Sequence, residues 1–389
     1  MDKPKLLIIG ASIYQHHLYN LAKKMGFQVY SIDQNPEAAM LRFADGFKVI
    51  DIYDIDAAVK YANEIDVDVV TSINLDQGMV AVNEIQARLG LSHKDKESIL
   101  KSTRKDKMRR EWEKAGVNIP EYEIFEYGDI DQAEKYVRSF NRDVIVKPVD
   151  NAAKRGISKI RDSEKDFRNR LQNAYDRSES NKIIVEEFID GELYFAPTYI
   201  TQNGDINCNV ISQNINDNFV QLEYIAPPSI DEDKKKLIKK EAQKAALCFG
   251  SGPYHSEIIY SKSRGPILIE TSPRISYATV ALTRLVFGFD PVKQLLGEAY
   301  NDDLPHEPPP SPTVSSARLV HVQPPPGATY IGGDIQRLKS LDYIYEIVPI
   351  IKEGEKVCTF KTNDDRVFYF VASSNYKYLK RYIKRNLFK

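Results

Sequence analysis

The first 95 residues alternate between short apolar runs and helical segments, and this alternation constrains the fold more than any other feature of the chain. Residues 6–9 read LLII and end at Gly10, a pattern typical of a buried parallel strand. The rhythm then continues with a helix predicted at 14–25, strands at 28–33, 44–51 and 66–74, and a helix at 54–65. Strands that alternate with helices in this way predict a doubly wound parallel sheet.

The middle of the chain is predicted to combine helices with antiparallel hairpins. A charged helix is expected at 98–115, closed by Gly116, and apolar strands at 142–149 and 183–189. A hairpin should turn at Asn203-Gly204, the strongest short turn signal in this part of the chain. Ser229 and Glu232 form a capping-box pattern that predicts a helix running to about residue 249.

The end of the chain is set apart by a cluster of prolines at 305–312, which predicts a linker. Short strands follow, and the last 14 residues form a basic helix that we interpret as a solvated amphipathic helix rather than as a site for an anionic partner. The whole chain is therefore expected to be a multidomain α/β and α+β protein.

Composition excludes several classes of function. The chain has 389 residues, and its formal net charge of -1 gives no case for nucleic acid as a partner. The apolar run at 6–9 is too short to act as a signal peptide or to span a membrane. Cys208, Cys248 and Cys358 have neither metal-ligand spacing nor a disulfide pattern, so a cytoplasmic location is expected.

A second predicted hairpin, at 255–270, carries the acidic residues of greatest interest. A turn centred on Ser263-Arg264 pairs residues whose numbers sum to 527, so Glu257 should lie opposite Glu270. Directly opposed carboxylates repel each other unless they share a proton, are solvated or bind a cation. Mg²⁺ is commonly held by one or two carboxylates together with phosphate oxygens, so a metal site and a solvated sheet surface both remain open at this point.

The same pairing predicts the faces of this hairpin. His255 should lie opposite Ser272, on the face that carries the two glutamates, and Arg274 continues this alternation. Arg274 could bind phosphate through two hydrogen bonds. The opposite, core-facing side is expected to carry Ile258, Tyr260, Ile267 and Ile269.

Several segments, in the same order, resemble the ATP-grasp superfamily, in particular single-unit carboxylate–amine ligases related to the large subunit of carbamoyl-phosphate synthase. They are residues 102–122, 144–160, 183–193 and 254–276. The resemblance implies a Rossmann-like domain that precedes the ATP-grasp domain (1–98), a two-part ATP-grasp domain (99–310) and a small C-terminal domain (311–389).

The resemblance also implies roles for individual residues. Lys107 and Lys147 match the two lysines that contact ATP phosphates, and a lysine inside an apolar strand, as at 147, needs a partner for its charge. Glu257, Glu270 and Ser272 match the positions of the Mg²⁺ ligands, and Arg274 matches an arginine that binds phosphate or carboxylate. The phosphate loop would use Lys154, Arg155 and Gly156, and the residues expected to flank adenine and ribose are Glu186, Glu187, Phe188, Ile189 and Glu192.

Further residues are assigned to substrate binding, each with a structural alternative. Ser276, Tyr277 and Arg284 would face the acceptor pocket, or they would form a helix start and a surface charge. Thr71, Asn74 and Asp76 follow the fourth strand, where such sheets bind ligands, or they form a turn. His255 is either a substrate contact or a structural histidine.

The implied activity is an ATP-dependent ligase that uses ATP and Mg²⁺, with Mn²⁺ as an alternative metal. It would activate a small-molecule carboxylate as an acylphosphate and join it to an amine, without nucleic acid or membrane partners, and the resemblance allows a homodimer. Two alternatives stay open. One is an enzyme that forms carboxyphosphate, as carboxylases and carbamoyl-phosphate synthases do, and the other is a nucleotide-binding module without catalysis.

Overall fold

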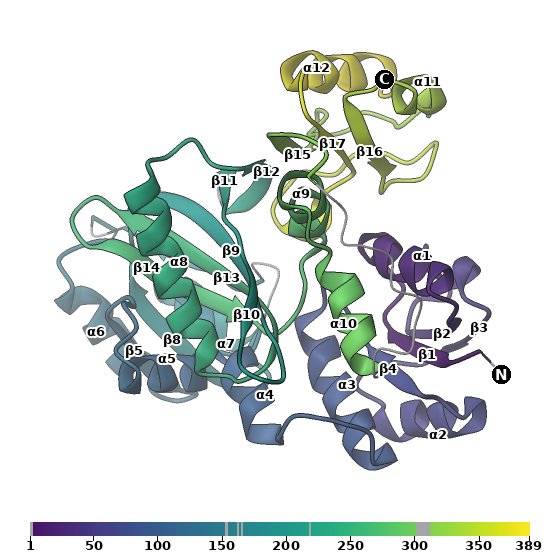
Figure 1. Cartoon of the computed structure of the whole chain (residues 1–389). Coiled ribbons are helices and arrows are strands. Elements are labelled where there is room, and N and C mark those ends of the chain that lie inside the picture. The colour runs from purple at the N-terminus through teal and green to yellow at the C-terminus, as the bar shows by residue number, and fades with distance from the viewer. Residues whose placement is uncertain (1–2, 152–154, 162, 165, 218, 301–311) are drawn as a thin grey trace.

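A computed structural model describes residues 3–151, 155–161, 163–164, 166–217, 219–300 and 312–389 (Figure 1). Its N-terminal part contains the predicted parallel sheet, with strand order β3-β2-β1-β4. The strands are β1 (Lys5–Ile9), β2 (Gln28–Asp33), β3 (Gly46–Val49) and β4 (Val69–Thr71). The helices α1 (His16–Lys24), α2 (Ile55–Ile65) and α3 (Asp76–Leu89) connect or follow them. The predicted fold of this part is confirmed.

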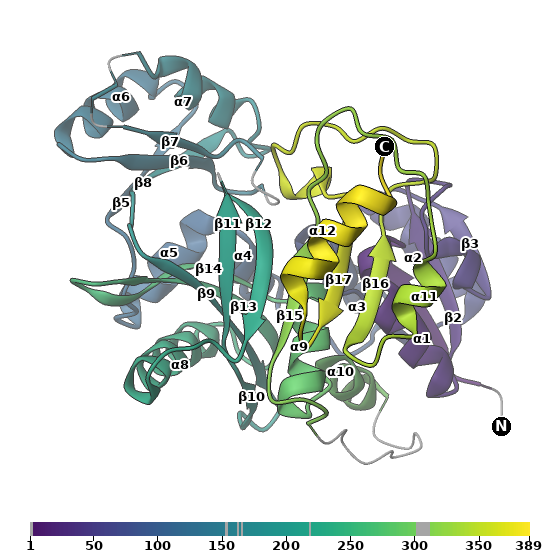
Figure 2. The same cartoon turned by 90° about the horizontal axis from the view of Figure 1, so that it is seen from above.

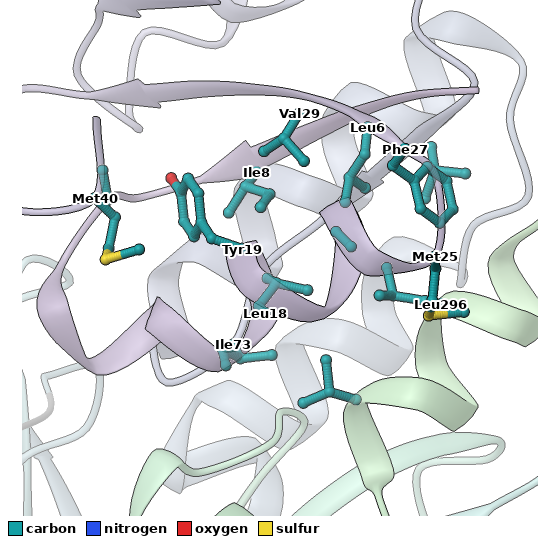
Figure 3. Packing of buried hydrophobic residues seen from close by; sticks show 14 of the residues in the cluster. Leu6, Ile8, Leu18, Tyr19, Met25, Phe27, Val29, Met40, Ile73 and Leu296 are labelled. Carbon is teal, nitrogen blue, oxygen red and sulfur yellow. The ribbon is translucent and has the colours of Figure 1, made fainter. Parts of the chain in front are cut away.

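The core under α1 draws residues from far along the chain. Leu6, Ile8 and Leu18 pack in one buried cluster. Val292 and Leu296 of α10 (Pro291–Ala299) belong to the same cluster, and Leu296 lies beside Met25 (Figure 3). The N-terminal sheet is thus packed directly against a helix that follows the hairpin at 255–270.

The helix expected at 98–115 is two helices, α4 (Lys96–Thr103) and α5 (Lys105–Lys114), so the prediction of one continuous helix was wrong. Arg104 between them has extended backbone angles, with φ -108° and ψ 122°. The reason is tertiary, because the Lys105 amide donates to the carbonyl of Val149 at 2.8 Å instead of continuing a helix. This contact brings the start of α5 to the end of another strand.

A second sheet has the order β5-β8-β6-β7, and its neighbouring strands are antiparallel. Its strands are β5 (Tyr122–Glu126), β6 (Val144–Pro148), β7 (Ser158–Ile160) and β8 (Lys182–Glu187). Helices α6 (Ile130–Ser139) and α7 (Arg168–Tyr175) cover it through a buried cluster that includes Val137 and Leu171 (Figure 2). The strands predicted at 142–149 and 183–189 are both present.

The third sheet has nine strands in the order β14-β13-β9-β11-β12-β15-β17-β16, with β10 beside β9. The strands before residue 300 are β9 (Glu192–Ile200), β10 (Ile206–Asn209), β11 (Ser212–Asp217), β12 (Val220–Ala226), β13 (Gly252–Ser261) and β14 (Gly265–Ser272). The hairpin predicted at Asn203-Gly204 is the β9–β10 pair. Helix α8 (Glu232–Leu247) covers one face of the sheet, where Ile238 and Ala242 pack with Tyr194 of β9 and Ile258 of β13.

The N-cap of α8 differs from the prediction. The side chain of Asp231 accepts a hydrogen bond from the Lys234 amide at 2.7 Å, and the helix begins at Glu232. Ser229 therefore lies outside the helix, and the capping box predicted for it was wrong. An aspartate is an equally good cap, so the pattern alone did not separate the two positions.

The C-terminal strands extend the third sheet. They are β15 (Ala317–His321), β16 (Ile344–Pro349) and β17 (Phe368–Ala372), and β15 pairs antiparallel with β12. Helices α9 (Tyr277–Phe287), α11 (Ile335–Lys339) and α12 (Tyr376–Asn386) pack around them (Figure 2). The predicted boundaries at 98 and 310 stay predictions, and most of the proline cluster lies outside the described residues.

Candidate active site

The two glutamates meet as predicted, although the turn that brings them together differs. Glu257 lies opposite Glu270, and His255 lies opposite Ser272. The strands are joined by three residues, 262–264, and nearer the turn the pairs sum to 526. A bulge between the pairs of Glu257 and Ile258 restores the predicted register at the glutamates.

The bulge changes which residues face the core. Leu268, not Ile269, pairs with Ile258, and these two side chains pack together under α8. Ile269 is the extra residue of the bulge and is only half-buried. The predicted core-facing set was therefore wrong at Ile269 and at Ile267, which pairs with Ile259 on the other face, because alternation along a strand does not continue through a bulge.

Both glutamates have partners from other elements. The Lys105 Nζ lies 2.9 Å from Glu270 Oε1 and also donates to the carbonyl of Asn151 at 2.9 Å. The Gln221 side-chain amide of β12 approaches Glu257 Oε1 at 3.4 Å. A buried lysine thus contacts one of the paired carboxylates from the start of α5.

Lys105 lies beside the paired carboxylates, the position at which Lys107 was expected. Lys107 is on the same helix, but its Nζ pairs with Glu97 Oε2 at 2.7 Å and its side chain is 32% exposed. Lys105 is 2% exposed. The structure therefore brings Lys105, and not Lys107, to the carboxylates. Residues 102–122 contain both lysines, and only the helix break at Arg104 decides between them.

Lys147 belongs to a buried cluster with Glu186 and Arg109. Its Nζ lies 2.6 Å from Glu186 Oε2, and Arg109 Nη2 lies 2.7 Å from Glu186 Oε1. Burial lowers the pKa of Lys147, and the charges of Arg109 and Lys105 lower it further, against the attraction of Glu186. Burial works to raise the pKa of Glu186, but Arg109 and Lys147 hold that pKa below its ordinary range. Cations outnumber carboxylates here, which favours an anionic ligand.

The predicted phosphate loop follows β6. Gly156 has φ +76°, and a Cβ there would lie 2.8 Å from Pro148 Cγ, so the position requires glycine. Arg155 donates to Asn151 at 2.9 Å and lies 3.4 Å from Asp364 of the C-terminal part. Lys154 lies outside the described residues.

Of the predicted hinge residues, Phe188 lines a cavity, whereas Glu187 pairs with charged residues of the surrounding structure. Glu187 forms ion pairs with Arg142 and with Arg264 of the β13–β14 loop. Phe188 lies under the Lys159 Nζ, 3.5 Å from its ring centroid, and both line a cavity of about 580 Å³. This cavity also touches β7, the β11–β12 turn and Lys361 of the C-terminal part.

The remaining two hinge predictions have different outcomes. Ile189 is buried, although it is not among the residues that line this cavity. Glu192 accepts hydrogen bonds from Tyr194 and from Lys234 of α8, which places it on the face that α8 covers. Glu192 was predicted to bind the ribose of ATP, but the structure does not bring it to the cavity that Phe188 lines.

Arg274 joins the hairpin strand to the N-terminal sheet. Its Nε lies 2.9 Å from Asp76 Oδ1, while its Nη1 is buried without a hydrogen-bond partner in the described part of the chain. The Asn74 amide donates to the carbonyl of Ile275 at 2.8 Å. Thr71 is buried at the end of β4. Of the residues predicted to bind ligand at the end of the fourth strand, Asp76 thus contacts Arg274 and Asn74 contacts the neighbouring Ile275, pairings that sequence reasoning had not made.

The residues predicted for the acceptor pocket separate. Tyr277 is buried, and its hydroxyl lies 2.6 Å from His321 Nε2 and 3.1 Å from Arg366 Nη1. Arg284 instead pairs with Asp290 at 3.3 Å and contacts His17 at 3.2 Å, a contact between α9 and α1. Ser276 is the buried residue before α9.

His255 packs against β9 and also lines a small cavity together with Arg274 and Ser276, so both alternatives for this residue stay predictions. Its ring stacks on Phe195 of β9 at 4.7 Å between ring centroids, and the side chain is 5% exposed. Gln221, Lys105, Arg109 and Arg366 are the site residues that sequence reasoning missed. For the three cations the local sequence carries no signal, because each lies in a charged stretch and only tertiary packing buries it.

Comparison with known proteins agrees with this geometry. Residues 140–283 match the family model of the ATP-grasp domain. Alanine–anticapsin ligase from Bacillus subtilis (strain 168) is 27% identical over 267 residues, which cover 62% of this chain and 56% of that relative. The matched part thus spans little more than half of that relative's length.

Two solved structures resemble the chain over nearly its full length. L-amino acid ligase from Bacillus licheniformis has a TM-score of 0.80 at 17% identity, with 99% of this chain and 97% of that one covered. The biotin carboxylase domain of 2-oxoglutarate carboxylase from Hydrogenobacter thermophilus, solved with MgADP and bicarbonate, has a TM-score of 0.77 at 15% identity, with coverage of 96% and 87%. The chain therefore contains an ATP-grasp domain and has the fold of ATP-grasp ligases, which confirms the resemblance and the predicted fold class.

Proposed function

We propose that this protein is an ATP-dependent ligase that joins a small-molecule carboxylate to an amine. The observation that carries the proposal is the carboxylate pair Glu257 and Glu270, which lies within reach of the buried lysine Lys105. Lys147 is electrostatically coupled to Lys105 in the same site. This combination of paired acids and buried lysines suits a metal–nucleotide complex.

The side chains present fit Mg²⁺. In the part of the chain that the structure describes, no group of three or more His, Cys, Asp or Glu side chains could hold a metal without help. Two carboxylates are nevertheless sufficient where phosphate oxygens complete the ligand set. Glu257 and Glu270 would hold the ion, with Ser272 two residues further along β14. The ion would neutralise charge on the phosphates of ATP.

The proposed roles of the other residues follow from their positions. Lys105 and Lys147 would bind phosphate oxygens, and the loop with Arg155 and Gly156 would cover them. Phe188 would contact the nucleotide base from the cavity beside the hinge. Arg274 has a buried Nη1 that could stabilise the transferring phosphoryl group.

The reaction balances without a protein nucleophile. A carboxylate oxygen of the substrate attacks the terminal phosphorus of ATP, and the bond to ADP breaks. The nitrogen of the amine then attacks the acyl carbon, phosphate leaves, and the amine loses a proton. The protein contributes orientation of the reactants and stabilisation of charge.

The test is release of ADP with Mg²⁺ and a panel of amino acids, both singly and in pairs. ADP release that depends on an amino acid, with an amide product detected by mass spectrometry, supports the ligase. ATP turnover only with bicarbonate would replace it with the carboxyphosphate-forming enzyme. Binding of ATP without turnover on any substrate would replace it with a non-catalytic module. Repeating the assay with Mn²⁺ tests the alternative metal, and sedimentation of the same sample tests the proposed homodimer.

The choice of lysine gives a matched pair of variants. Lys105→Met should lower kcat/KM roughly 100-fold or more, because a charge next to the phosphates is lost. Lys107→Met, two residues away on the same helix, should stay within about threefold, since its partner Glu97 lies outside the site. The opposite ranking would return the phosphate role to Lys107.

A further inference from the structure

One buried arginine of the C-terminal part is not used by the proposed reaction. Arg366 precedes β17 and is 5% exposed. Its Nη1 donates to the Tyr277 hydroxyl at 3.1 Å, and its Nη2 donates to Asn363 Oδ1 at 2.6 Å and to Gln221 Oε1 at 3.3 Å. All three acceptors are neutral oxygens.

The charge of Arg366 has no counterion. Across the described ranges no carboxylate forms an ion pair with Arg366, and its Nε is buried without a hydrogen-bond partner. The neighbouring acids are engaged elsewhere, because Asp364 pairs with Arg155 and Asp365 accepts from the amides of Lys361 and Thr362. Buried charges are normally paired, since removal of an ion from water costs several kcal/mol.

The aromatic neighbours of Arg366 are neutral. Burial, and after it the charge of Arg366, lowers the pKa of His321 well below its ordinary value, so this imidazole is neutral. Burial raises the pKa of Tyr277 well above its ordinary value, so this phenol also stays neutral. The guanidinium is thus a positive charge in contact with neutral side chains, and the carboxylate of Glu257 lies one side chain away, beyond Gln221.

The position of Arg366 connects it to the proposed metal site. Gln221 accepts from Arg366 through Oε1 and approaches Glu257 through its amide nitrogen, so one side chain separates the guanidinium from that carboxylate. Tyr277 lies three residues after Arg274. The side chain of Asn363 also accepts a hydrogen bond from the backbone amide of Gln221 at 3.1 Å. Tyr277, Gln221 and Asn363 therefore hold the arginine from three different parts of the chain, one side chain away from Glu257.

We propose that Arg366 binds a carboxylate group of the substrate and determines specificity for carboxylate-bearing molecules such as amino acids. A carboxylate would supply the missing counterion and would accept the unused Nε–H. Because this site deepens the proposed function, it rests on that function for its role in the reaction, whereas the binding of a carboxylate can be measured without turnover.

The experiment measures thermal unfolding of the full chain with added anions at constant ionic strength. The probes are the 20 standard L-amino acids, acetate and inorganic phosphate, and each amino acid that raises the Tm is compared with its carboxamide. We expect at least one amino acid to raise the Tm and its carboxamide to have no effect. If inorganic phosphate raises the Tm and no amino acid does, Arg366 would instead bind a phosphoryl group, and the proposal would be overturned.

Three variants locate the effect. Arg366→Met should weaken the apparent affinity for the responding amino acid roughly 10- to 100-fold, the usual loss for hydrogen bonds to a charged group. Arg366→Lys, which keeps the positive charge, should retain part of the affinity that Arg366→Met loses. Arg318→Met is the matched control, since that arginine is on the surface of β15 and pairs with Glu223 at 3.5 Å. Each variant is compared with its own Tm without ligand.

Two further results would overturn the proposal. The first is a wild-type protein whose Tm responds to no carboxylate, and the second is a response that Arg366→Met retains in full. The proposed ligase activity is judged separately by ADP release. Amino-acid-dependent turnover with an unchanged KM for the amino acid in Arg366→Met would reject the role of Arg366 and leave the ligase standing. A carboxylate-specific Tm shift without turnover would support the role of Arg366 and reject the ligase.

Discussion

At the scale of single residues, the site is built from charges that are buried together. Glu186 is the only carboxylate between Arg109 and Lys147 within ion-pair distance of both, as far as the described residues show. Its side chain is 3% exposed, so water cannot replace it if it is removed. The predicted place of Glu186 beside adenine stays a prediction, and in the structure its carboxylate pairs with two cations.

The change Glu186→Gln should lower the free energy of unfolding by roughly 3–5 kcal/mol, because it leaves two buried cations without a counterion. Glu192→Gln is the control and should cost about 0–1 kcal/mol, since its pair with Lys234 is half-exposed. Urea unfolding of both variants measures the difference. Equal losses in the two variants would contradict the assigned role.

The same variant has a pH signature. Because the pKa of Glu186 in the folded state lies below its ordinary value of 4.5, its contribution is fully present above pH 4.5 and disappears as the pH falls through the folded pKa. The stability gap between wild type and Glu186→Gln should therefore narrow as the pH is lowered below about 4.5.

At the scale of elements, two short segments determine the geometry of the candidate active site. The bulge in the β13–β14 hairpin turns Leu268 to the core while Glu257 and Glu270 stay opposed. The loop after β6 ends at Gly156, where a positive φ and the contact with Pro148 leave no space for a side chain. The hairpin was predictable from strand alternation, but the bulge and the loop conformation were not.

Gly156→Ala should raise the KM for ATP several-fold or more, because the added Cβ would displace the loop or Pro148. Gly204→Ala is a matched control, since Gly204 has a similar φ of +86° but no atom within 4 Å of an added Cβ. It should cost roughly 1 kcal/mol of stability and leave the KM for ATP unchanged. Steady-state kinetics and thermal unfolding of both variants separate backbone strain from steric contact.

At the scale of the whole molecule, the parts share cores and sheets. The N-terminal cluster includes Val292 and Leu296. The C-terminal strands continue the sheet that carries the glutamates, and α9 packs across the neighbouring strands β12 and β15. In the portion that the structure describes, no helix is both long and apolar enough to cross a membrane.

We expect the chain to unfold in one cooperative transition, because two of its buried clusters combine residues from different parts of the chain. Calorimetry should give one peak whose calorimetric and van't Hoff enthalpies agree. Val292→Ala, which opens a cavity between the N-terminal sheet and α10, should lower the Tm of the whole transition. Leu237→Ala on the exposed side of α8 should not. Two resolved peaks would contradict shared cores.

The sequence alone determined the features that depend on local periodicity. Apolar runs that alternate with helical segments predicted the parallel sheet. Alternation along a strand, whose period is two, predicted that Glu257 and Glu270 share one face of the hairpin, whereas their direct opposition depends on the bulge. A lysine within an apolar strand predicted that Lys147 would have a charged partner.

Only the tertiary structure decided which distant residues meet. It selected Lys105 over Lys107 through one backbone hydrogen bond to Val149, and it paired Arg274 with Asp76. It also placed Arg366 one side chain away from Glu257. These contacts join residues 36 to 198 positions apart, and their energies depend on burial, which no local pattern of residues encodes.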